Sequence, residues 1–326
     1  RFNSPLTRNP LDESFENKKG TASERNLMLL ALLKEHGVKA YPVLVSSLEN
    51  GKPVTNYPFL SQFDHVIVYT ELDGKGNFID ITNSMLPCNM PDPDAMNKAG
   101  LMITDETVGW VELKPEAASA KLLFNLSLTP EGRLSGDLST SHEGYDAYFE
   151  RLNWKKDKEG KFWTERLQSN FPDAKATEIK CEGIEKIEDP LMTSCQINVE
   201  EAATVAGDMI YLSPIIFTDF SENPFKKETR LFPVERSYPV KEQEVINLTI
   251  PEGYSIESLP ESVNLSLPNK SANFKYLVNP NGNKIQIISK IEMSDTFYAP
   301  DQYGALKNFM DIIVQKMGEQ IVLKKA

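Results

Sequence analysis

The sequence predicts an α+β protein of two domains, and three features of its hydrophobic pattern support this prediction. Residues 20–36 contain a dense apolar run with the spacing of a buried helix. Short segments that alternate apolar and polar residues, as strands do, then dominate the chain, most densely between 175 and 292. Residues 303–320 return to helical spacing. The 326 residues correspond to about two domains, at about 150 residues for each.

The first domain is assigned to residues 1–115. After an entry segment, we expect the helix at 20–36 to have Ser23 as its N-cap and to end before Gly37. A turn at 73–77 and a loop rich in proline and aspartate complete the domain. Its strands are expected at 38–47, 65–70 and 77–82.

The second domain is assigned to residues 116–326, because the pattern changes near 113–120. Two strands at 122–128 and 134–139 form a hairpin around a Pro-Glu-Gly turn. A helix is expected over 144–170, followed by many short strands. Regular spacing of short strands is typical of a mainly antiparallel β-sandwich, here with a C-terminal helix at 303–320.

The charge of the chain excludes some classes of partner. It has 35 basic and 47 acidic residues, for a net charge of −12. Proteins that bind nucleic acids or anionic lipid surfaces need a basic face, so we expect neither partner. No run of about 18 apolar residues exists, so no transmembrane segment is expected. Because the chain starts with Arg1, we expect a processed chain or a piece of a longer one.

Cysteine and histidine are too scarce for a metal site. The three cysteines are Cys88, Cys181 and Cys195, none in a C-x-x-C pair, and the chain has three histidines. We therefore expect neither a metal nor a cofactor. Cys181 and Cys195 could pair across a hairpin, and the sequence leaves this pairing open.

Three residues lie where a catalytic triad could form. Ala22 stands at the start of the predicted helix, His65 at the start of a strand, and Asp80 on the next strand of a hairpin. A cysteine at position 22 would have its thiolate stabilised by the helix dipole, with His65 as partner and Asp80 fixing the ring. Paired strands bring residues such as His65 and Asp80 to adjacent positions.

Four stretches in this order resemble the core of the transglutaminase-like superfamily, the papain-related cysteine fold. In that family the helix begins with Gly-x-Cys, and a histidine strand and an Asp-x-Thr strand follow. The resemblance implies a transglutaminase-like fold for the first domain. The matching stretches are Lys19–Glu24 leading into Leu27–Leu33, Gly37–Leu44, Phe63–Val68 and Phe78–Thr82.

The chain departs from the family at its nucleophile, because the position of the cysteine is occupied by Ala22. An alanine methyl group cannot attack a carbonyl group. The whole chain also resembles the C-terminal two thirds of multidomain envelope proteins of Bacteroidetes. The resemblance implies a non-catalytic protein of the periplasm, cell surface or exterior. It would bind or scaffold a protein, peptide or glycan, or other domains of the same full-length chain, and His65 and Asp80 would be remnants of the triad.

An active hydrolase or acyl transferase with a relocated nucleophile is the alternative hypothesis. Cys88, Thr21 or Ser23 would be the nucleophile, with His65 as base. Against this, a Ser or Thr at a helix start is usually a cap, and a lone Cys is usually structural.

Two further motifs have structural interpretations. Trp154 and Trp163 flank several lysines, which we interpret as a solvated helix end with two anchoring aromatic residues. Residues 223–226, Arg230 and the segment 232–234 are interpreted as a rigid loop that leads into a strand.

Overall fold

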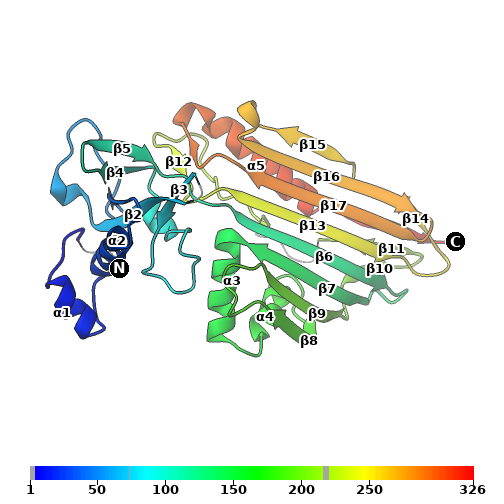
Figure 1. Ribbon diagram of the computed structural model, residues 1–326. Helices are drawn as coiled ribbons and strands as arrows, with labels where there is room; N and C mark the ends of the chain where they lie inside the picture. The colour runs from blue at the N-terminus through cyan, green and yellow to red at the C-terminus, as the bar shows by residue number, and fades with distance from the viewer. Residues whose placement is uncertain (1–3, 73, 216–219) are drawn as a thin grey trace. The chain divides into compact units, whose positions relative to one another are not determined.

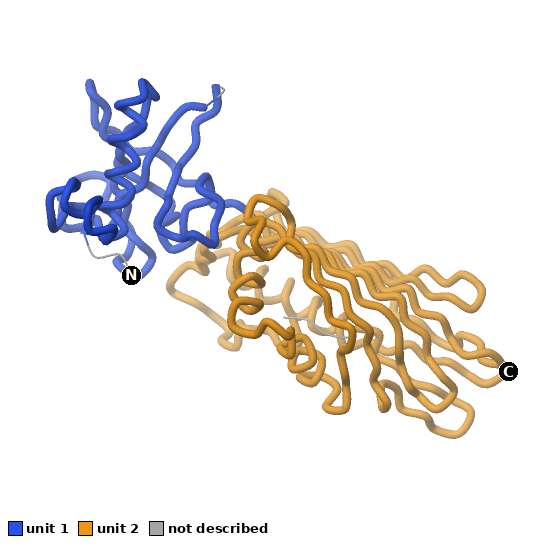
Figure 2. Tube along the Cα trace, turned by 60° about the horizontal axis from the view of Figure 1, so that its bottom comes forward, with its two compact units in different colours: residues 1–116 blue, residues 117–326 orange. Residues whose placement is uncertain are grey.

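The computed structural model describes residues 4–72, 74–215 and 220–326 (Figure 1). The chain divides into two compact units, residues 1–116 and 117–326, which Figure 2 shows in different colours. Strands outnumber helices in both units, and the α+β class is confirmed. Within the described residues, every helix is too short or too polar to cross a lipid bilayer.

Unit 1 is built on a five-stranded antiparallel sheet in the order β3-β2-β1-β4-β5. Helices α1 (Leu11–Glu16) and α2 (Ala22–Glu35) precede the sheet. Its strands and its two short 3₁₀ turns are β1 (Ala40–Val45), η1 (Leu60–Gln62), β2 (His65–Leu72), β3 (Lys75–Ile79), η2 (Pro93–Ala95), β4 (Ala99–Ile103) and β5 (Val108–Glu112).

Both faces of this sheet are buried around its centre. Leu30 of α2 lies in a cluster with Ala40 and Val68 on one face. Val43 and Ile67 belong to a second cluster, and because neighbouring strand residues point in opposite directions, it covers the other face. This double burial explains why β2 begins with a continuous buried run and does not alternate.

Three local predictions for unit 1 are modified by the structure. The helix predicted at 20–36 is present, but Thr21 is the N-cap in place of Ser23, because Thr21 and Glu24 form a reciprocal capping box. β3 ends at Ile79, so Asp80 lies just beyond the strand on which it was predicted. Asp73, part of the predicted turn, lies outside the described residues.

The main element of unit 2 is an eight-stranded sheet in the order β15-β16-β17-β13-β6-β7-β9-β8. β13 and β6 pair in parallel, and the other neighbours in this order are antiparallel. The strands are β6 (Ala118–Leu128), β7 (Leu134–Glu143), β8 (Lys175–Glu182), β9 (Leu191–Val199), β13 (Val240–Thr249), β15 (Val263–Ser266), β16 (Ala272–Asn281) and β17 (Lys284–Met293).

One face of this sheet is the core and the other meets solvent. Along β6, Leu122, Phe124 and Leu126 are buried, whereas the residues between them are exposed. β9 and β17 show the same alternation. This alternation with a period of two residues determines which face of the sheet is covered. A shift of the strand by one residue would turn its apolar side chains to solvent and its polar side chains to the core.

Helices and a smaller sheet cover the core face together. The smaller sheet has the order β10-β11-β19-β14, and β12 pairs with β18. Side chains from α5 and from β11 and β19 belong to the same apolar cluster as the large sheet. The remaining helices, strands and 3₁₀ turns of unit 2 are α3 (Gly144–Lys156), α4 (Lys161–Gln168), β10 (Ala203–Ala206), β11 (Met209–Leu212), β12 (Val234–Glu235), β14 (Tyr254–Ser258), η3 (Pro268–Lys270), β18 (Phe297–Tyr298), η4 (Pro300–Gln302), α5 (Tyr303–Met317) and β19 (Ile321–Lys325).

The prediction of a mainly antiparallel unit with a C-terminal helix is confirmed, with three modifications. The helix predicted over 144–170 is two helices, because Gly160 has a left-handed backbone (φ 72°) that interrupts it. The C-terminal helix ends at Met317, and the chain then adds β19 to the smaller sheet. Two sheets do share the core, as in a sandwich, but three helices occupy much of the covered face.

Gly144 is expected to be essential to the junction between β7 and α3. Its φ is +60°, and a Cβ atom there would overlap the carbonyl oxygen of Ala117. We expect Gly144→Ala to lower the free energy of unfolding of unit 2 by about 1–3 kcal/mol, measured by urea denaturation. The control is Gly304→Ala in α5, where a Cβ would meet nothing within 4 Å. Equal effects of the two substitutions would contradict this assignment of strain to Gly144.

Candidate functional site

His65 and Asp80 form a buried hydrogen-bonded pair in unit 1. His65 is the first residue of β2, and β3 returns alongside β2 to place Asp80 next to it. The distance from His65 Nε2 to Asp80 Oδ2 is 3.0 Å. His65 is 0% exposed and Asp80 is 3% exposed, so the pair is shielded from water.

Asn26 of α2 joins the helix to this pair. Its amide group donates to the carbonyl of Val66 at 2.8 Å and to Asp80 Oδ1 at 2.9 Å, and its Oδ1 accepts from the backbone N–H of Ile81 at 3.0 Å. Both amide hydrogens are thereby used, so the Asn26 nitrogen is a close neighbour of His65 Nε2, at 3.5 Å, and not a donor to it.

The carboxylate of Asp80 accepts four hydrogen bonds. Besides those from His65 and Asn26, Oδ1 accepts from the backbone N–H of Thr82 at 2.9 Å and from its hydroxyl at 2.6 Å. Burial alone would raise the pKa of Asp80. The hydrogen bond and charge of His65, with the bonds from Thr82 and Asn26, outweigh burial and lower the pKa below its ordinary 3.8. Asp80 is therefore held as a carboxylate.

This arrangement fixes the tautomer of His65. Because Asp80 accepts at Oδ2, Nε2 of His65 bears a hydrogen in either charge state, and whenever the ring is neutral its lone pair is on Nδ1. Ala22 is the first residue of α2 and precedes Asn26 by four residues, so the two share one face of the helix. An imidazole base held by a carboxylate is the arrangement that activates a nucleophile, but Ala22 offers no nucleophilic atom.

The hydroxyl groups beside Ala22 are engaged with the backbone. Thr21 Oγ1 accepts from the backbone N–H of Glu24 at 3.1 Å, as an N-cap does. Ser23 is buried, and its hydroxyl donates to the carbonyl of Ser4 at 2.6 Å. Cys88 is an exposed free thiol whose carbonyl accepts from the backbone N–H of Asp80 at 2.9 Å.

Glu24 holds the N-terminal segment against the start of α2. Its Oε1 accepts from the backbone N–H groups of Arg8 and Asn9 at 2.7 and 3.1 Å, and its Oε2 accepts from that of Thr21 at 2.7 Å. The bonds from Thr21 and then Arg8 are the main causes that lower the pKa of Glu24 from 4.5 to about 2. The position of residues 8–9 thus depends on one ionised carboxylate.

Sequence reasoning did not identify Asn26 or Glu24. The Thr-x-x-Glu spacing of residues 21–24 is the signature of a capping box and could have identified Glu24. Asn26 is a polar residue directly before an apolar helical run, four residues after Ala22. Nothing in the local pattern shows that its partners are 40 and 54 residues away.

A second histidine forms a similar pair in unit 2. His142 Nδ1 is 2.5 Å from Asp146 Oδ2, and its Nε2 is 2.9 Å from Thr140 Oγ1. The order hydroxyl, imidazole, carboxylate resembles that of a hydrolytic triad. Thr140 is only 1% exposed and lies on the core face of β7, so no substrate reaches it. The pair instead links β7 to the first turn of α3.

The remaining predicted residues have structural positions. All three cysteines are free, with Cys181 and Cys195 on the neighbouring strands β8 and β9. Burial raises the pKa of the Cys195 thiol to about 11. Trp154 and Trp163 are both buried in the core of unit 2. Among the described residues, no three His, Cys, Asp or Glu side chains are grouped as metal ligands would be.

Comparison with protein families matches part of unit 2. Residues 208–323 match the family described as "Domain of Unknown Function with solved-structure structure (DUF3858)". The match covers about a third of the chain and runs from β11 to β19. The comparison with curated proteins gave no match.

Comparison with solved structures finds a similar fold. A crystal structure from Parabacteroides distasonis ATCC 8503, described as that of a "putative protease", has a TM-score of 0.54 and 11% sequence identity to this chain. The alignment covers 98% of this chain and 46% of the other, so this chain spans about half the length of its neighbour. At this identity the likeness concerns the fold alone.

Acid should release the N-terminal segment. A carboxylate with a lowered pKa stabilises the folded state fully above its ordinary value of 4.5, and this contribution is lost as pH falls towards about 2. We expect amide hydrogen exchange of residues 4–16 to become faster over this pH window relative to the intrinsic rate. Glu24→Gln should show fast exchange already at neutral pH. Glu13→Gln, at an exposed position of α1, is the control and should behave like the unaltered protein.

Proposed function

We propose that unit 1 is a transglutaminase-like module without its nucleophile, which acts in the bacterial cell envelope by binding or scaffolding. Its ligand would be a protein, a peptide or a glycan, or another domain of a longer chain. The fold likeness to a longer protein described as a "putative protease" is in keeping with such an origin.

The observation that supports this proposal is the buried His65–Asp80 pair, which Asn26 joins to the first turns of α2. The carboxylate of Asp80 is also bonded by Asn26 and Thr82, and Asn26 belongs to the helix face that begins with Ala22. Burying a carboxylate–imidazole pair costs free energy because both groups lose their contact with water. The four hydrogen bonds to Asp80 offset this cost, which supports the interpretation of the pair as a retained part of a site. What an acyl-transfer enzyme would add at this place is a thiol.

Restoring the thiol tests the proposal directly. In Ala22→Cys, prepared with Cys88→Ser to remove the exposed thiol, we expect a thiol pKa about one unit or more below the ordinary 8.5. The helix N-terminus and a protonated His65 both stabilise the thiolate. The measurement is the rate of alkylation by iodoacetamide against pH, followed at this cysteine by mass spectrometry.

A matched control separates the helix dipole from the histidine. Lys161→Cys places a thiol at the first position of α4, where the side chain is exposed and its ion partner is Glu159. If the thiol of Ala22→Cys titrates at the same pH as that of Lys161→Cys, position 22 is not the nucleophile position of a triad.

One observation favours a second candidate function, a hydrolase with Cys88 as nucleophile. The backbone of Cys88 is bonded to that of Asp80, and its side chain is exposed. The chain after Asp80 therefore returns the backbone of a cysteine to Asp80 without using Ala22.

Turnover measurements separate the two functions. The binding proposal predicts that the unaltered protein cleaves no member of a panel of fluorogenic peptides and amides. The hydrolase proposal predicts turnover that both Cys88→Ser and His65→Ala abolish, while Cys181→Ser retains it. Turnover with that pattern would replace the binding proposal.

A further inference from the structure

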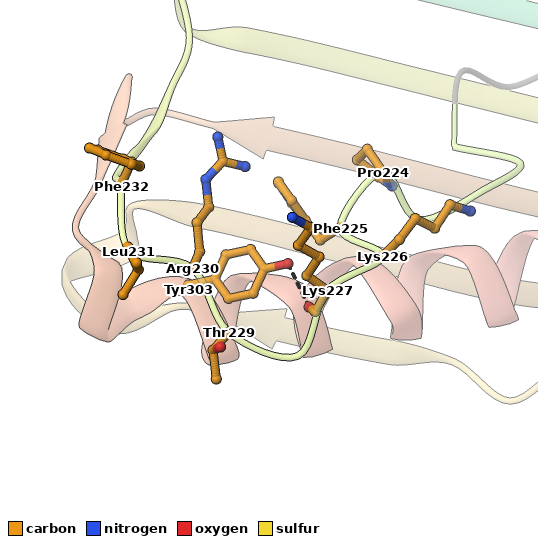
Figure 3. Close-up of a pocket in the computed structure, with 9 residues that line it drawn as sticks. All are labelled: Pro224, Phe225, Lys226, Lys227, Thr229, Arg230, Leu231, Phe232 and Tyr303. Carbon is orange, nitrogen blue, oxygen red and sulfur yellow. Dashed lines mark hydrogen bonds between the residues drawn. The ribbon is translucent and has the colours of Figure 1, made fainter.

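A segment of unit 2 between β11 and β12 forms a pocket with the start of α5. Figure 3 shows residues 224–232 curving around Tyr303, the first residue of α5. The pocket is partly open to solvent, and its volume of about 750 Å³ is within the range of small-molecule sites. This pocket lies in unit 2, so it is distinct from the His65–Asp80 site of unit 1.

The segment is anchored on α5 by side-chain contacts. Asn223 Nδ2 donates to the carbonyl of Lys307 at 3.0 Å and to Asp311 Oδ1 at 2.7 Å. The Tyr303 hydroxyl donates to the carbonyl of Lys227 at 2.7 Å, the bond drawn in Figure 3. The ring of Phe225 packs edge-on against that of Tyr303, with centroids 5.6 Å apart. These contacts fix residues 223–227, so one wall of the pocket is held in place on α5.

Positive charge gathers in this pocket of an acidic chain. Lys226, Lys227 and Arg230 line it, and the described residues of its lining include no acidic side chain. Lys226 is paired with Glu222 at 2.8 Å, but both are exposed, and such pairs are weak. Lys227 and Arg230 form no ion pair with the described residues of the protein. Glu228, between Lys227 and Arg230 in the sequence, lies outside the lining and is 3.7 Å from Lys307, so it does not contribute negative charge to the lining.

Apolar side chains in the same lining are left in contact with water. Leu231 is 88% exposed and Phe232 is 75% exposed, although each is large and apolar. These two residues line the same pocket as Phe225 and Tyr303, and exposed large apolar side chains gathered in one place are typical of a binding surface. Contact with a ligand would remove much of this area from water.

We propose that this pocket binds a small amphipathic anion. An apolar body would lie against Leu231, Phe232 and Tyr303. A carboxylate or similar oxyanion would pair with Arg230, whose planar guanidinium donates to two oxygens at once, and with Lys227. The ligand is a free molecule and not a lipid within a bilayer, because the net charge of −12 repels an anionic membrane surface.

Calorimetric titration with octanoate tests the proposal on the full chain. We expect saturable binding with a dissociation constant of about 1 mM or tighter, and binding of 1-octanol at least about tenfold weaker. Arg230→Gln should weaken octanoate binding by about tenfold or more, the loss of one charge-assisted bond. Phe232→Ser should weaken octanoate and octanol alike.

Matched substitutions on the exposed face of the large sheet are the controls. Lys121→Gln and Leu123→Ser remove an exposed cation and an exposed apolar side chain outside the pocket, and both should leave octanoate binding unchanged. Because Arg230, Leu231 and Phe232 are exposed, their replacement is not expected to alter folding, which thermal unfolding checks.

Three results would overturn the proposal. They are the absence of saturable octanoate binding at about 1 mM, equal binding by Arg230→Gln and the unaltered protein, and equal affinity for octanoate and octanol. Sedimentation with phosphatidylglycerol vesicles that depends on Arg230, without binding of free octanoate, would assign the pocket to a membrane surface instead.

Discussion

The parallel pairing of β6 with β13 is the constraint on which the larger unit depends. It joins strands β6, β7, β8 and β9 to strands β13, β15, β16 and β17 through an uninterrupted register from Ala118–Val240 to Ser127–Thr249. Since β9 is antiparallel to β7, and β7 to β6, β9 and β13 run in the same direction. The chain that connects β9 to β13 must therefore run back from one end of the sheet to the other. This return contains β10, β11 and the segment that forms the pocket on α5.

In the smaller unit, buried polar groups on α2 determine how the helix packs against the strands. Asn26 ties the helix to β2 and to the residues after β3, while Glu24 ties it to residues 8–9. Leaving such groups without partners inside a protein costs more than the bonds themselves contribute, so they select one arrangement of helix, strand and loop. The candidate site is thus part of what fixes the packing of α2.

The sequence predicted the elements whose signal is local and missed those that depend on distant partners. The apolar run at 27–33 and the period-two segments identified α2 and most strands. The four-residue β10 and five-residue β19 are too short to show a period. Pairing with β11, and for β19 also with β14, makes them strands. His65 and Asp80 could be placed together because a hairpin joins them. Asn26 could not, since its bonds cross 40 residues or more.

The two outer strands of the large sheet determine whether it could grow further. β15 has only four residues. β8 is irregular, with a shift of register between Thr177 and Lys180 and a left-handed backbone at Glu178 (φ 52°). A short edge and a bent edge present no long straight row of N–H and C=O groups to the strand of another molecule. The wide sheet is thereby protected against edge-to-edge aggregation, a risk that grows with every long, flat strand left at a border.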